Sequence, residues 1–122
     1  MQRPRIVLAE DHAEVAEQLR ALLISEFDVV AVVADGQALL RTVEADRPDV
    51  VVTDVVMPGT LDGVALAQWI GRERPALYVI LATAVTTAAD GSAVHSYGRV
   101  VLKPYDFAQI AWIIEAALAN RQ

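Results

Sequence analysis

Short apolar runs recur along the chain, and each is followed by a polar residue or a turn signal. Continuous runs of this kind are typical of strands that are buried on both faces of a sheet. The runs that fit this description are residues 6–9, 29–33, 50–53, 77–82 and 100–102. Residues 50–53 are β-branched throughout, which favours a strand at the centre of the sheet.

Between these runs, apolar residues repeat with the spacing of an α-helix. In the first interval, one predicted helical face carries Val15, Leu19, Leu22 and Leu23. Similar stripes predict helices that follow Asp35-Gly36 and Asp62 and a last helix over 107–118. Asp11 and Asp62 are suited to cap the helices that follow them.

The chain therefore alternates strand and helix five times, which predicts an α/β fold with a parallel sheet covered by helices on both faces. The stretch 85–97 is the least regular, because Asp90-Gly91-Ser92 interrupts it and makes any helix there short. The chain has 122 residues, the size of one domain, and no linker separates a second one.

Composition narrows the classes of function. Hydrophobic residues make up 55% of the chain, which excludes disorder, and the absence of cysteine excludes disulfides and thiolate metal sites. The formal net charge of −6 makes nucleic acid a poor partner. No apolar run approaches the roughly 20 residues of a membrane span, and the first residues do not begin a signal peptide. We therefore expect a cytoplasmic protein that binds neither nucleic acid nor membrane.

Polar side chains follow four of the five predicted strands: Glu10-Asp11, Asp54, Thr83 and Lys103. Parallel strands end at one edge of the sheet, where open α/β sheets bind ligands. Three acids suit a hard divalent cation such as Mg²⁺, and a lysine and a hydroxyl beside it suit phosphoryl oxygens. The pattern predicts that Asp54 attacks a phosphoryl donor to form an aspartyl phosphate, while the metal and Lys103 offset the charge that builds up.

The same positions carry a resemblance to a known family, and five motifs occur in order: Glu10-Asp11, Asp54 with Met57-Pro58, Asp62-Gly63, Thr83-Ala84 and Lys103-Pro104-Tyr105. Together they resemble the receiver domain of two-component response regulators, the CheY-like fold. The resemblance implies a single receiver domain over residues 1–122, without an output domain in this chain. It also implies a (βα)5 flavodoxin-like, doubly wound, five-stranded parallel sheet with strand order 2-1-3-4-5.

The resemblance assigns a metal site around the phosphoacceptor, Asp54. Asp11, Asp54 and the backbone carbonyl of Val56 would bind Mg²⁺ (or Mn²⁺) directly, and Glu10 would act through water. The phosphoryl group would come from a sensor histidine kinase or a histidine phosphotransfer protein. The chain would thus be a phosphorylated switch rather than a conventional enzyme, although it would assist its own phosphorylation and slow dephosphorylation.

The resemblance also assigns contacts to the phosphoryl group. Thr83 and Lys103 would touch its oxygens with their side chains, and the backbone at Val56 and Ala84 would complete the contacts. The bond between Lys103 and Pro104 would be cis, a form that proline permits at modest cost.

An interaction face is implied as well, since family members often use the fourth helix, fifth strand and fifth helix to dimerise or signal. Tyr97, Val100 and Trp112 are its predicted members in this sequence, and a homodimer is one expected partner. Trp112 lies about 200° around the helix from Ile110, so we expect it to point outward. Trp69 is expected to be a partly buried packing residue.

Three departures from the family pattern bear on its behaviour. The loop from Asp54 to Gly63 is one residue longer than the commonest spacing, and Val100 stands where an aromatic residue often couples to the threonine. Val56 and Val85 occupy positions that flank the incoming water during hydrolysis in relatives. Neither valine can orient water by a side-chain hydrogen bond, so we expect a long-lived phosphorylated state.

Other readings of the sequence are open to test. A degenerate receiver would bind proteins without being phosphorylated. A haloacid-dehalogenase-like phosphatase would need a second Asp two residues after the first, where this chain has Val56. A nucleotide-binding flavodoxin-like module would need a Gly-rich loop after the first strand. His12 and His95 are expected to be surface residues, because no second metal-ligand spacing supports them as ligands or phosphodonors.

Overall fold

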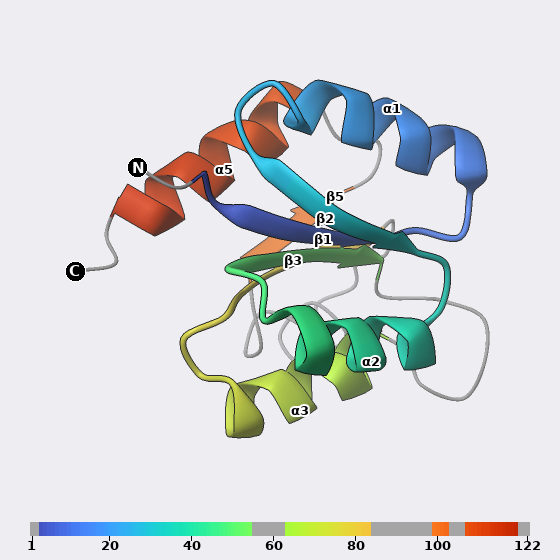
Figure 1. The fold of residues 1–122 in the computed structure, drawn as a ribbon, viewed down its shortest axis with the longest axis vertical. Coiled ribbons are helices and arrows are strands. Elements are labelled where there is room, and N and C mark those ends of the chain that lie inside the picture. The colour runs from blue at the N-terminus through green and yellow to red at the C-terminus, as the bar shows by residue number, and fades with distance from the viewer. Residues whose placement is uncertain (1–2, 55–62, 84–98, 103–106, 120–122) are drawn as a thin grey trace.

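The computed structural model describes residues 3–54, 63–83, 99–102 and 107–119 (Figure 1). Its elements in chain order are β1 (Arg5–Ala9), α1 (Ala13–Leu23), β2 (Asp28–Val33), α2 (Gly36–Asp46), β3 (Val50–Asp54), α3 (Gly63–Glu73), β4 (Tyr78–Thr83), β5 (Arg99–Leu102) and α5 (Phe107–Ala119). The helix expected within 85–97 lies outside the described residues.

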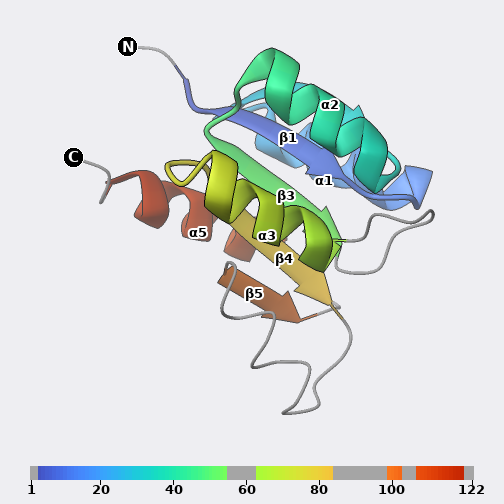
Figure 2. The ribbon, with the colours of Figure 1, turned by 90° about the horizontal axis from the view of Figure 1, so that it is seen from below.

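All neighbouring strands pair in parallel, in the order β2-β1-β3-β4-β5. Helices α1 and α5 cover one face of the sheet, and α2 and α3 cover the other (Figures 1 and 2). The α/β architecture predicted from the sequence is therefore confirmed, because a buried parallel sheet needs helices on both faces.

Successive side chains along a strand point to opposite faces of the sheet, so they pack in two different hydrophobic clusters. On the α1–α5 face, Ile6 and Leu8 of β1 pack with Leu19 and Leu23 of α1. On the opposite face, Val7 packs in a cluster with residues of α2 and α3. This alternation follows from the two-residue period of a strand, and it explains why β1 and β3 read as uninterrupted apolar runs.

Strand β3 is the best protected element, since every residue from Val50 to Asp54 is buried. By contrast, β2 is only half-buried, and Val32 is 40% exposed. The prediction that 29–33 is a fully buried strand was wrong, because β2 lies at the edge of the sheet and has a neighbouring strand on one side only.

Helix α1 differs from its predicted limits and face. It begins at Ala13, with His12 at the N-cap position and no side-chain capping bond, so Asp11 does not cap it. Ala16, Leu19 and Leu23 are buried, whereas Leu22 is 52% exposed. The predicted inner face was therefore wrong at Leu22, because the helix is rotated toward Ala16.

Helix α2 has a local signal at each end. The Asp35 carboxylate accepts a 2.8 Å hydrogen bond from the backbone N–H of Ala38, which caps the helix. At the other end, Arg47 adopts a left-handed conformation (φ 48°) immediately before Pro48. The predicted cap at Asp62 lies outside the described residues.

None of the helices in the described ranges has the length and apolar character of a membrane span.

The adjacent leucines of α1 give a matched test of the helix orientation. Leu23 is 1% exposed, so Leu23→Ala should lower the free energy of unfolding by about 2–5 kcal/mol through lost burial and a residual cavity. Leu22→Ala should change it by about 0.5 kcal/mol or less. Urea denaturation followed by circular dichroism measures both, and equal losses in the two variants would contradict this orientation.

Candidate functional site

Two neighbouring parallel strands deliver carboxylates to one edge of the sheet. Ala9 is the register partner of Thr53, so Glu10 and Asp54, the residues that follow them, lie next to each other on neighbouring segments of the chain. The backbone N–H of Glu10 donates a 3.0 Å hydrogen bond to the carbonyl of Val33, which extends the pairing of β1 with β2 by one residue. Asp54 is itself the last residue of β3 and pairs with Ala82.

These two acids are buried, which is uncommon for charged side chains. Glu10 is 5% exposed and Asp54 is 3% exposed, and Asp11 is exposed beside them. Next to Asp54, the Thr53 hydroxyl donates a 3.0 Å hydrogen bond to the Asp54 carbonyl oxygen and so holds the end of the strand. Packing two carboxylates together out of water is costly, and a cation at this edge would offset that cost.

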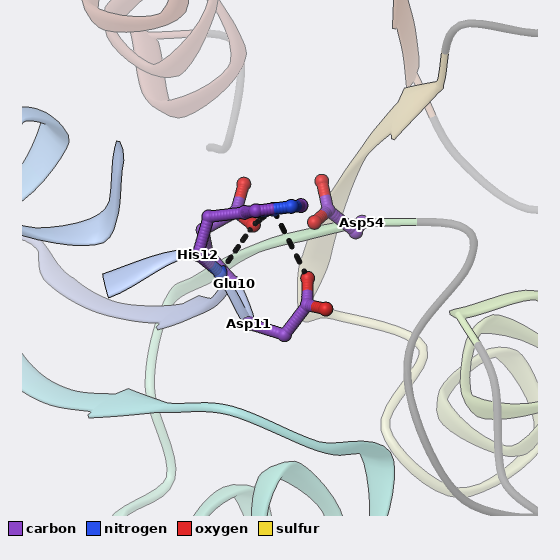
Figure 3. A group of neighbouring side chains, drawn as sticks. All are labelled: Glu10, Asp11, His12 and Asp54. Atoms are coloured by element: carbon purple, nitrogen blue, oxygen red, sulfur yellow. Dashed lines mark hydrogen bonds and ion pairs between the residues drawn. The ribbon is translucent and has the colours of Figure 1, made fainter. Parts of the chain in front are cut away.

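His12 completes the group, which the sequence interpretation missed (Figure 3). Its Nδ1 lies 2.9 Å from Glu10 Oε2 and 3.4 Å from Asp11 Oδ1, and its backbone N–H donates a 3.0 Å hydrogen bond to Glu10 Oε2. The side chain is 70% exposed, as expected of a surface residue, yet it lies against the acids. His12 directly follows Glu10-Asp11 in the sequence, at the turn from β1 into α1, and this position could have predicted that it lies beside the acids.

The donor set fits a divalent metal ion. One ligand atom from each of Glu10, Asp11, His12 and Asp54 can be chosen so that all lie within 4.8 Å of one another. Three of these groups are carboxylates, which suit Mg²⁺, and the exposed position of Asp11 lets solvent reach the group. The predicted convergence of Glu10, Asp11 and Asp54 is therefore observed.

The remaining predicted site residues are only partly placed. Thr83 is the last residue of β4, and its register partner is Leu102 of β5, so its backbone reaches the same edge as Asp54. The Thr83 side chain is not among those described. Five further predicted residues lie outside the described ranges: Val56, Ala84, Tyr97, Lys103 and Pro104.

Trp112 is 63% exposed, which confirms its predicted outward orientation. It lies on an open groove of about 320 Å³ between α1 and α5, lined by Leu22, Leu23, Glu26, Ala108, Ala111, Trp112 and Glu115. The nearby Glu26 carboxylate raises the pKa of Glu115 by like-charge repulsion. The described neighbours of Trp112 thus come from α1 and α5, and its grouping with Tyr97 and Val100 stays a prediction.

Trp69 is half-buried and packs against the clusters beneath α3, as predicted. The guanidinium of Arg74 lies 5.9 Å from the centroid of its ring, within the range of a cation–π contact. This contact gives Trp69 a structural role at the end of α3.

Comparison with known proteins agrees with the geometry. Residues 6–115 match the family of the response regulator receiver domain. The chain is 31% identical over 122 residues to the transcriptional regulatory protein PdtaR of Mycobacterium tuberculosis, covering 95% of this chain and 57% of PdtaR. It is 27% identical over 124 residues to the DNA-binding transcriptional regulator NtrC of Escherichia coli, covering 100% of this chain and 26% of NtrC. The chain thus spans about half of one relative and about a quarter of the other.

Solved structures give the same result. The isolated REC domain of RcsB from Salmonella enterica serovar Typhimurium, in the presence of phosphomimetic BeF3−, is 27% identical with a TM-score of 0.87, covering 99% of this chain and 92% of that one. The signal receiver domain of the NarL response regulator from Mycobacterium tuberculosis is 26% identical with a TM-score of 0.88, covering 99% and 100%. On this sequence match and fold, the chain belongs to the family of response regulator receiver domains.

Proposed function

We propose that Asp54 accepts a phosphoryl group from a phosphohistidine on a sensor histidine kinase or a histidine phosphotransfer protein. The observation that carries this proposal is the buried Asp54 carboxyl at the end of the central strand, with ligand atoms of Glu10 and Asp11 within 4.8 Å. Membership of the receiver family supports the same role. Phosphorylation would then shift the population between two conformations of the domain.

The chemistry follows from the residues at this edge. A carboxylate oxygen of Asp54 attacks phosphorus, the new O–P bond forms as the P–N bond to histidine breaks, and the imidazole leaves with the electron pair. Mg²⁺ held by Asp11, Asp54 and the Val56 carbonyl, with Glu10 acting through water, would neutralise charge on the phosphoryl oxygens. By family likeness, Thr83, Lys103 and the backbone at Val56 and Ala84 contact those oxygens.

On this proposal the chain is a switch that assists its own phosphorylation. A surface away from Asp54 would then bind the partner that receives the signal. We propose that residues 85–97 supply the fourth helix of a (βα)5 fold and form an interaction face with β5 and α5. The 63% exposure of Trp112 supports a contact there, because aromatic residues are enriched at interface cores. A second copy of the chain is one partner that this face would bind.

The metal site makes a prediction about stability. Without divalent ions, Asp54→Asn should raise the free energy of unfolding by on the order of 1 kcal/mol, because it removes one of several clustered carboxylates. Mg²⁺ should then stabilise wild type but not the variant. Denaturation with chelator or Mg²⁺ measures this, and Glu44→Gln, on the exposed side of α2, removes the same charge elsewhere. An equal gain in both variants would rule out local repulsion.

Phosphorylation is tested by intact mass. With acetyl phosphate and Mg²⁺, wild type should gain one phosphoryl group, while a chelator or Asp54→Asn should prevent the gain because nucleophile and metal are both required. The matched control is Asp28→Asn, an exposed residue at the start of β2, which should be modified like wild type. A wild-type chain that stays unmodified, or a modified Asp54→Asn chain, would contradict the proposal.

The lifetime of the phosphorylated state is a separate prediction. Val56 cannot hold the attacking water, so loss of the phosphoryl group should be slow. Val56→Asn should speed it by about tenfold, the effect of one hydrogen bond of about 1.4 kcal/mol in the transition state. Intact mass after removal of the donor follows the decay. Fast loss that Val56→Asn leaves unchanged would refute this view of hydrolysis.

The interaction face predicts a role for Trp112. Trp112→Ala should weaken self-association of the phosphorylated chain by about tenfold or more, because truncating a buried interface tryptophan removes about 2 kcal/mol. Sedimentation velocity with and without phosphorylation measures this, and Leu22→Ala serves as the control on the α1 side of the groove. Unchanged self-association and unchanged kinase affinity in Trp112→Ala would exclude the face.

A further inference from the structure

A cleft lies between the ends of α2 and α3, at the edge of the sheet opposite Asp54. Each of these helices is followed directly by an Arg-Pro pair, Arg47-Pro48 after α2 and Arg74-Pro75 after α3. Both helices cover the same face of the sheet (Figures 1 and 2). The two pairs line one cleft of about 280 Å³, together with Val43, Glu73, Ala76 and Leu77.

We propose that this cleft binds a small carboxylic acid with an apolar body, and that Arg47 and Arg74 hold its carboxylate. The cleft is separate from the proposed phosphorylation site. Pro48 and Leu77 precede the first residues of β3 and β4, whereas Asp54 is the last residue of β3. The inference therefore goes beyond the proposed function and does not depend on it.

The floor of the cleft is apolar. Val43 is 1% exposed and Pro48 is buried. Leu77 is half-buried and packs against the hydrophobic cluster that contains Val43. Small-molecule pockets are lined mainly by apolar groups, with a few polar groups that fix the orientation of the ligand. A volume of about 280 Å³ is near the lower end of their size range, so the cleft suits a small ligand.

The charged groups of the cleft favour an anion. Arg47 is exposed, Arg74 is half-buried, and Glu73 has the only carboxylate among the described lining residues. Two positive side chains thus outnumber one negative side chain, although the whole chain has a formal net charge of −6. Guanidinium groups bind carboxylates through two parallel N–H donors. A neutral apolar ligand would leave these donors unused, and an anion without an apolar body would leave the floor uncovered.

Arg74 also has an unused hydrogen-bond donor. Its Nη1 donates a 2.9 Å hydrogen bond to the backbone carbonyl of Glu73, and its guanidinium lies over the Trp69 ring. Its Nε is buried and has no hydrogen-bond partner among the described residues, although buried polar groups nearly always have one. A small turn of this half-buried side chain would bring Nε to the cleft, where a bound carboxylate would supply the missing partner.

The helix ends explain part of this arrangement but not all of it. Cations interact favourably with the C-terminal ends of helices, which accounts for an arginine after each of α2 and α3. The backbone N–H groups of Arg47 and Arg74 already bond to the carbonyls of Val43 and Ile70, at 3.2 and 2.7 Å. The helix dipoles explain neither the buried apolar floor between the arginines nor the unpaired Nε.

The experiment titrates benzoate into the full chain and follows ¹H–¹⁵N spectra. Benzoate should cause saturable shifts of the backbone amide signals of Val43, Arg74 and Leu77 and of the Arg74 Nε–H signal. Benzamide has the same body without the charge, and acetate has the charge without the ring. Each should bind at least about tenfold more weakly than benzoate, because each lacks one of the two interactions.

Three variants separate the cleft from general charge effects. Arg47→Gln should weaken benzoate binding by about tenfold, because it removes a charge-assisted donor. Glu73→Gln should strengthen binding by about two- to fivefold, because it removes a like charge at an exposed position. Arg41→Gln is the matched control, since Arg41 is an exposed residue of α2 that does not line the cleft, and it should leave the affinity unchanged.

Two results would overturn the inference. One is a titration in which benzoate leaves the amide signals of the cleft and the Arg74 Nε–H signal unshifted. The other is equal affinity for benzoate in the Arg47→Gln and Arg41→Gln proteins, since binding would then not involve the cleft arginine. Phosphorylation at Asp54 is measured separately by intact mass, so either result would leave the proposed function standing.

Discussion

The parallel register between β1 and β3 is the constraint on which the site depends. Because Ala9 pairs with Thr53, the residues that follow them, Glu10 and Asp54, are also neighbours across the sheet. Their two carboxylates therefore lie side by side. The hydrophobic clusters on both faces of the sheet hold that register, since a slip of one residue would turn core side chains outward. Apolar packing thereby forces together charges that would otherwise repel each other.

This arrangement divides the site into a buried half and an exposed half. Asp54 and Glu10 are buried at the ends of β3 and β1, where pairing with the neighbouring strands fixes their backbone positions. Asp11 and His12 lie on the segment that leads from β1 into α1, and both are exposed. The buried half places two carboxylates at the edge of the sheet, while the exposed half is open to solvent. A site built on strand ends and completed by a connecting segment suits a binding function.

Strand β2 and helix α1 differ from the predictions made for them, and each difference has a physical cause. Residues 29–33 were predicted to be buried because they are as continuously apolar as the run in β3, yet the edge position of β2 leaves it only half-buried. Leu22 matches the helical period as well as Leu23 does, and only the rotation of α1 on the sheet decides which leucine is buried. In both cases the local pattern predicted the strand or helix correctly, but it did not predict which residues the neighbouring elements would bury.

The sequence by itself determined the alternation of strands and helices, the parallel sheet and the acids that follow strands, because hydrophobic period and turn signals are local properties. The motifs at the strand ends also indicated the receiver family, to which the sequence match assigns the chain. Only the tertiary structure decided that His12 faces Glu10 and Asp11, that Asp11 does not cap α1, and that Trp112 borders a groove with α1. These features depend on how the turn into α1 and the packing of α1 with α5 orient side chains, which no periodicity in the chain records.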